Sequence, residues 1–184
     1  MILNLHGLYG AAENTNYKIL TESYSASEIY SPQIHYENRS PNDIVDELSA
    51  IKGISSVVGN SFGGFFAYVL SAKWSCPCLL VNPAVPPTKY IRGLVPDYPE
   101  EFLNELKQLE DSALATQNHQ SLCDTFVILG KHDDVIDSNF TKGYLKNVEL
   151  YEVEEGHHIS GMGCKRLIKE LVYKMEDSAH GQDT

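Results

Sequence analysis

Short runs of apolar residues recur along the chain, and segments rich in polar residues and glycine separate them. Several of these runs are apolar at nearly every position, which is typical of parallel strands that are buried on both faces of a sheet. The pattern predicts about six strands, at residues 2–5, 27–34, 55–60, 78–82, 125–130 and 148–153. Pro32 is expected to end the second of them.

Between these runs the apolar positions follow the period of an α-helix. Asn42 can cap a helix in which Ile44, Val45, Leu48 and Ile51 fall on one face. Further helices are predicted at residues 62–74, 98–117 and 165–175. Strands that alternate with helices indicate an α/β protein with a mostly parallel sheet flanked by helices.

The length and composition are consistent with a single domain. The chain has 184 residues, of which 42% are hydrophobic, and we expect one domain over residues 1–175. The segment 85–120 is too long for a plain connection, so we expect a short helical, lid-like insertion over one end of the sheet. The polar end of the chain, residues 176–184, is expected to be disordered.

The formal net charge of −11 limits the possible partners. A negative surface repels phosphate backbones and anionic lipid, so we expect no nucleic-acid or membrane partner. No run approaches the roughly 18 apolar residues that a membrane span needs. The chain starts directly with a predicted strand and shows no signal peptide, so we expect a cytoplasmic protein.

The four cysteines do not form a recognisable metal site. Cys76 and Cys78 are separated by a single residue, whereas zinc-binding pairs usually leave two to four. We therefore expect these two residues, with Cys123 and Cys164, to be small buried hydrophobes of a reduced protein, with no bound metal.

One short motif carries chemistry. Residues 59–63, Gly-Asn-Ser-Phe-Gly, fit the G-x-S-x-G pattern between a predicted strand and a predicted helix. A serine at such a corner has a strained backbone that points its hydroxyl out of the sheet. Gly59 and Gly63 would lie so close to their surroundings that side chains would collide. The pattern predicts Ser61 as the nucleophile of an acyl-transfer enzyme.

A serine nucleophile needs a base and a carboxylate that orients the base. For this architecture the expected order along the chain is serine, acid, histidine, and suitable residues follow the last two predicted strands. The candidates are Asp133, Asp134 and Asp137 for the acid, and His157 and His158 for the base.

The oxyanion of an acyl-transfer intermediate needs two backbone N–H donors. The N–H of Phe62, directly after the nucleophile, is one candidate. The N–H of Leu8, in the loop after the first strand, is the other. In that loop His6 is expected to bond nearby backbone rather than to act as a base, and no role is assigned to His132.

Together, the segments LNLHGLYG, VVGNSFGGFFAYVL, LLVNPAV, LGKHDDVID and EEGHHIS resemble the α/β-hydrolase superfamily, and within it the small YqiA-type esterases. The resemblance covers residues 2–175. It implies hydrolysis of carboxylic esters or thioesters without a cofactor. In the related hydrolases a glycine stands three residues before the acid and two before the base, which selects Asp133 and His158.

The insertion and the small size of the chain guide the expected substrate. The insertion is expected to cover a pocket for short to medium acyl groups, and the candidate pocket residues are Tyr9, Asn82, Val85 and Tyr90. The same triad could serve a peptidase or an acyltransferase, and the fold could persist as an inactive binding protein. A nucleotide-binding domain is disfavoured because GNSFGG lacks the spacing and the lysine of a phosphate-binding loop.

Overall fold

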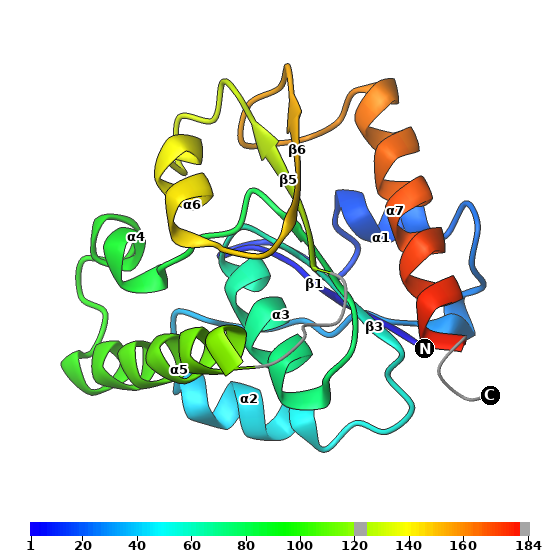
Figure 1. The fold of residues 1–184 in the computed structure, drawn as a ribbon. Coiled ribbons are helices and arrows are strands. Elements are labelled where there is room, and N and C mark those ends of the chain that lie inside the picture. The colour runs from blue at the N-terminus through cyan, green and yellow to red at the C-terminus, as the bar shows by residue number, and fades with distance from the viewer. Residues whose placement is uncertain (120–124, 181–184) are drawn as a thin grey trace.

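A computed structural model describes residues 1–119 and 125–180 (Figure 1). These residues contain one sheet of six parallel strands in the order β2-β1-β3-β4-β5-β6. The strands are β1 (Ile2–Leu5), β2 (Ile29–Tyr30), β3 (Ser56–Asn60), β4 (Cys78–Val81), β5 (Thr125–Gly130) and β6 (Glu149–Val153). The predicted parallel α/β architecture is confirmed, although β2 is shorter than the apolar run that predicted it.

The register brings the carboxyl ends of the strands to one edge of the sheet. Leu5 of β1 pairs with Gly59 of β3, Asn60 pairs with Val81 of β4, and Gly130 of β5 pairs with Val153 of β6. The loops that follow these strands therefore emerge together, where open parallel sheets bind their ligands.

Helices cover both faces of the sheet (Figure 1). One face packs against α2 (Pro41–Ser49), α3 (Ser61–Trp74) and α5 (Glu100–His119), and the other against α1 (Thr15–Leu20) and α7 (Met162–His180). Leu3 and Leu5 of β1 point into the first apolar core, whereas Ile2 points into the second. This alternation is the two-residue period of a strand that is buried on both sides.

Helix α3 is apolar around its whole circumference because it is enclosed by the sheet and the neighbouring helices. Every residue from Ser61 to Ser71 is buried. A helix of this kind belongs to a protein core rather than to its surface. Its first turn, at the carboxyl end of β3, is consequently held by packing on all sides.

The segment expected to form an insertion contains α4 (Pro87–Leu94) and α5. Helix α5 packs against α2 and α3, so it contributes to the helical layer on one face of the sheet. The role of the segment as a cover for the active site stays a prediction.

The expectation of a disordered tail from residue 176 is wrong for its first part. Helix α7 continues to His180, because apolar residues at helical spacing, Ile168, Leu171, Val172 and Met175, anchor it on the sheet. Residues 181–184 lie outside the described ranges, as does Cys123. Cys76, Cys78 and Cys164 are buried, as predicted. No helix within 1–119 or 125–180 is long and apolar enough to cross a membrane.

Candidate active site

The corner between β3 and α3 has the strain that the sequence predicts. Ser61, the first residue of α3, has a φ of 52°, in the left-handed region that L-residues rarely occupy. A Cβ at Gly59 would lie 2.5 Å from the carbonyl oxygen of Gly63, and a Cβ at Gly63 would lie 2.2 Å from that of His6. Both glycines are therefore required by close backbone approach.

We predict that Gly63→Ala strongly destabilises the protein. The new methyl group would overlap backbone atoms of His6 and Leu5, which cannot rotate away, and overpacking of this kind costs about 3 kcal/mol or more. Urea denaturation measures the loss. Gly93→Ala in α4 is the matched control, because nothing lies within 4 Å of a Cβ there. Equal stability of the two variants would contradict the prediction.

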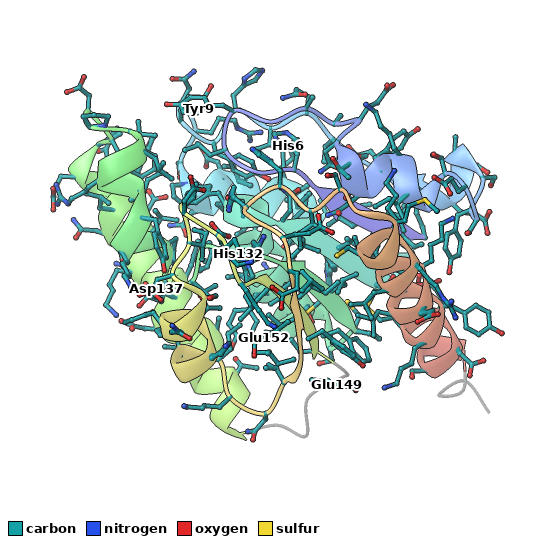
Figure 2. The ribbon with its side chains drawn as sticks, turned by 90° about the horizontal axis from the view of Figure 1, so that it is seen from above. His6, Tyr9, His132, Asp137, Glu149 and Glu152 are labelled. Atoms are coloured by element: carbon teal, nitrogen blue, oxygen red, sulfur yellow. The ribbon has the colours of Figure 1, made fainter. Side chains whose placement is uncertain are left out.

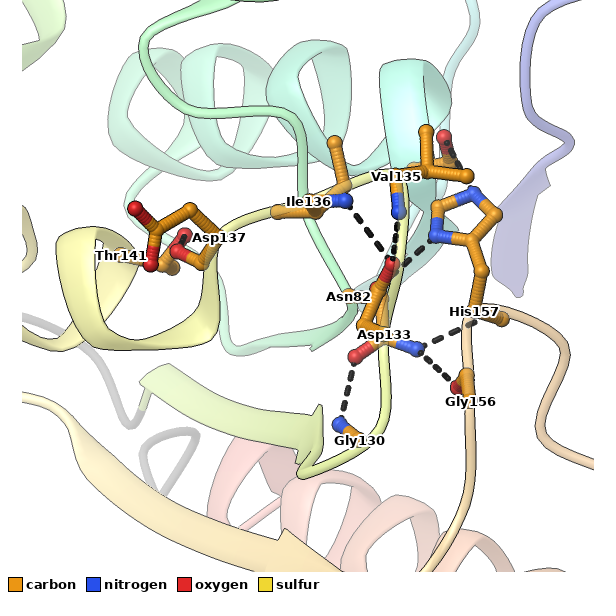
Figure 3. A network of polar contacts seen from close by, with 10 residues as sticks. Asn82, Gly130, Asp133, Val135, Ile136, Asp137, Thr141, Gly156 and His157 are labelled. Carbon is orange, nitrogen blue, oxygen red and sulfur yellow. Dashed lines mark hydrogen bonds and ion pairs between the residues drawn. The ribbon is translucent and has the colours of Figure 1, made fainter.

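The side chains of Ser61, Asp133 and His157 meet at the carboxyl edge of the sheet. Figure 3 shows the contact between Asp133 and His157. The Nε2 atom of His157 lies 3.1 Å from Oγ of Ser61. The Nδ1 atom of the same ring lies 2.9 Å from Oδ2 of Asp133. An ionised carboxylate only accepts hydrogen bonds, so Nδ1 carries the proton and Nε2 is free to accept the hydroxyl proton of Ser61. This is the geometry of an activated serine.

The carboxylate of Asp133 is held in a fixed orientation. Its side chain is 1% exposed, and its Oδ1 accepts hydrogen bonds of 2.8 Å from the N–H groups of Val135 and Ile136. Burial opposes ionisation, but the hydrogen bonds from His157 and from these N–H groups outweigh it and lower the pKa of Asp133. Asp133 therefore stays charged beside the imidazole.

The structure corrects the choice between the two adjacent histidines. His157 is 12% exposed and joins Ser61 to Asp133, whereas His158 is exposed and packs edge-on against the His157 ring. The choice of Asp133 over Asp134 agrees with the geometry, since Asp134 is exposed and Asp133 is the residue bonded to the imidazole.

The sequence could not show which histidine faces the serine. Neighbouring side chains in a loop point in different directions, and tertiary contacts set that direction here. Glu155 accepts hydrogen bonds from the N–H groups of Ser160 and Gly161, which closes the loop around His157. The sequence signal, the spacing from Gly156 to the base of related hydrolases, selected His158, whereas the ring beside Ser61 is that of His157.

The loop after β1 lies against Ser61, as the oxyanion prediction requires. A Cβ at Gly7 would lie 3.1 Å from Cβ of Ser61, and Leu8 follows directly. His6 is fully buried; its Nδ1 bonds the carbonyl of Gly7 at 2.7 Å and its Nε2 accepts the N–H of Ile34 at 2.9 Å. His6 is thus a structural residue, as expected, and the donor roles of Leu8 and Phe62 stay predictions.

We predict that His6 makes the fold less stable in mild acid. Burial is the main cause that lowers the pKa of His6, which is held neutral because Nε2 is an acceptor. Below a pH of about 6.5, the ordinary pKa of histidine, His6 binds a proton in the unfolded chain but stays neutral in the folded protein. The free energy of unfolding therefore falls as the pH falls.

The comparison of wild type with His6→Gln isolates this effect from that of the other titrating groups. Wild type is expected to melt higher at pH 7.5, with the difference in Tm shrinking toward pH 5.5. A difference that stays constant over this range would contradict the prediction.

A cavity of about 280 Å³ opens beside Ser61 and His157. One wall comes from the loop after β1 and from the start of α1, and the other from the loop after β6. Most of its side chains are polar, and both charges are present; the lining includes Leu8, Glu13, Asn14, Asn16, Lys18, His158 and Ile159.

None of the four residues expected to form the substrate pocket lines this cavity. Asn82 and Val85 are each 1% exposed, and the amide of Asn82 is bonded to backbone groups, so neither side chain is open to this cavity. Tyr9 is 66% exposed and lies at the outer edge of the molecule (Figure 2). Tyr90 belongs to α4, on the side of the sheet away from α1.

The described part of the chain, residues 1–119 and 125–180, contains no group of three or more His, Cys, Asp or Glu side chains that could hold a metal ion. The acidic residues of β6 and the loop that follows it pair with nearby groups: Glu149 with Lys174, Glu152 with Lys142, and Glu154 with Lys131. In Figure 2, Glu149 and Glu152 lie apart from His6.

Comparison with known proteins places the chain among α/β-hydrolase folds. Residues 1–171 match the model of the Uncharacterised protein family (UPF0227). No curated protein matches the sequence. Among solved structures, Est1E from Butyrivibrio proteoclasticus with ferulic acid bound has a TM-score of 0.65 at 12% identity, covering 95% of this chain and 88% of that chain.

Two further structures are similar. An esterase from Pyrococcus furiosus has a TM-score of 0.64 at 16% identity, over 95% of this chain and 81% of its own. The mouse alpha/beta hydrolase domain-containing protein 10 has a TM-score of 0.65 at 13% identity, over 96% and 89%. These similarities show a shared fold.

Proposed function

The chain belongs to the Uncharacterised protein family (UPF0227) and has the α/β-hydrolase fold, and from this premise we propose that it is a serine hydrolase that cleaves small carboxylic esters or thioesters. The observation that carries the proposal is the chain of two hydrogen bonds from Asp133 through His157 to Ser61. Fold alone does not define an activity, so the argument depends on this site.

In the proposed reaction, Ser61 Oγ attacks the acyl carbon while His157 Nε2 takes its proton. The N–H groups of Leu8 and Phe62 donate to the oxyanion. His157 then protonates the leaving alkoxide or thiolate, and a water activated by the same ring releases the acid. The charge on Asp133 holds the tautomer of His157 and stabilises its cation. This scheme requires no cofactor.

The cavity favours a small and polar substrate. Its volume of about 280 Å³ is at the lower limit for small-molecule sites, and amide, carboxylate and ammonium groups outnumber its apolar residues. Buried polar groups that lack partners penalise a long aliphatic chain. Est1E, solved with ferulic acid, is a fold relative that holds a small hydroxylated carboxylic acid, which is consistent with this class.

A fluorophosphonate probe tests the nucleophile without any assumption about the substrate. We predict that wild type is labelled at Ser61, identified by mass spectrometry of the tryptic peptides. His157→Ala should slow labelling at least about 1000-fold, because the hydroxyl loses its base.

The matched comparison is His158→Ala, the same substitution one residue away, which we expect to slow labelling by no more than about tenfold, because the ring that lies 3.1 Å from Oγ of Ser61 is that of His157. Slow labelling of His158→Ala with normal labelling of His157→Ala would overturn the assignment of the base. No labelling of folded wild type would favour an inactive binding protein.

A series of p-nitrophenyl esters tests the substrate size. We predict that kcat/KM is highest for acetate and propionate and falls at least about tenfold by octanoate, because the longer chain cannot enter the polar cavity without leaving polar groups unpaired. An activity that rises with chain length up to octanoate would contradict this prediction.

A further inference from the structure

The turn that follows β4 touches the backbone of all three segments that carry the proposed triad. The N–H of Ala84 donates to the carbonyl of Ser61 at 2.9 Å. The side chain of Asn82, two residues earlier, reaches the segments that carry Asp133 and His157 (Figure 3). A turn without any reacting group therefore lies at the centre of the site.

The amide of Asn82 joins the ends of β5 and β6. Its Oδ1 accepts a hydrogen bond of 2.7 Å from the N–H of Gly130. Its Nδ2 donates to the carbonyl of Gly156 at 3.1 Å and to the carbonyl of His157 at 3.0 Å. The partners fix the orientation of the amide, because the N–H faces its oxygen and both carbonyls face its nitrogen.

Asparagine suits this position in two ways. Asn82 has a φ of 43°, in the left-handed region where asparagine and glycine are tolerated best. Asn82 is also 1% exposed, so its amide, rather than water, satisfies the three backbone groups that it bonds. An aspartate of the same shape would keep the bond to Gly130 but would turn a carboxylate toward two carbonyl oxygens.

We infer that Asn82 is a positioning residue, which sets the direction of the His157 side chain by holding the His157 backbone at a fixed distance from the strand that leads to Asp133. The consequence of this inference for catalysis rests on the proposed function. The three hydrogen bonds of the Asn82 amide are a property of the fold alone. The amide bonds the carbonyl of His157 directly, so its loss frees the backbone that carries the imidazole.

Asn82→Gly tests the inference, because glycine accepts the left-handed backbone and removes only the amide. We expect labelling of Ser61 by the fluorophosphonate to slow about 10- to 100-fold, since small misplacements of a catalytic group have effects of this size. The second readout is the downfield proton resonance of His157 Nδ1–H, assigned by its loss in His157→Ala. We expect Asn82→Gly to broaden or lose this resonance.

Two controls separate positioning from general destabilisation. Asn147→Gly makes the same substitution at an exposed asparagine with a φ of 54°, in the loop before β6, and should match wild type. Leu48→Ala in α2 removes buried apolar contacts away from the site, and should lower Tm while the resonance and the labelling rate at 25 °C stay unchanged.

If Asn82→Gly does not fold at 25 °C, Asn82→Asp carries the test, with the same losses expected. A folded variant that is labelled at the wild-type rate and has an unchanged Nδ1–H resonance would overturn the inference. Absence of labelling in wild type, with the resonance present there and lost in Asn82→Gly, would overturn the proposed hydrolase and leave the positioning role of Asn82 supported.

Discussion

Helix α3 crosses the end of β1 so closely that no side chain fits between the two backbones. At Gly63 a Cβ would lie 2.2 Å from the carbonyl oxygen of His6, and at Gly59 the same atom would meet the carbonyl of Gly63. This contact forces Ser61 into the left-handed region and presses the loop after β1 against it. The placement of Ser61 beside the candidate oxyanion donors follows from one steric constraint.

The cost of that strained corner is offset by the surrounding core. Every residue from Ser61 to Ser71 is buried between the sheet and the helices α2 and α5. Phe62 and Phe66 pack against the ring of Tyr36, and His6 packs edge-on against the same ring. The helix therefore cannot relax outward, and the serine hydroxyl stays directed at the edge of the sheet.

Hydrogen bonds at the same edge of the sheet hold the loops that follow β5 and β6. The ends of β5 and β6 are joined by the amide of Asn82, and the loop beyond His157 is closed by Glu155. Buried carbonyl and N–H groups require hydrogen-bond partners, and a loop lacks the backbone partners of a regular element. In both cases a side chain supplies them. The imidazole of His157 is thereby held by bonds to its own backbone as well as by Asp133.

The sequence by itself determined the fold class and the position of the strained serine corner, because both depend on local patterns. Buried parallel strands are apolar throughout, and the glycines around Ser61 record a backbone contact that any sequence with this corner must satisfy. It also indicated Asp133 once the spacing of related hydrolases was considered.

The tertiary structure decided the rest. His157 rather than His158 faces Ser61 in a loop held by tertiary contacts: Asn82 donates a hydrogen bond to the carbonyl of His157, and Glu155 accepts hydrogen bonds from the N–H groups of Ser160 and Gly161. The cavity lies on the side of α1 rather than under residues 85–120, because α5 packs along α2 and α3, and long-range packing of this kind leaves no mark in a local pattern.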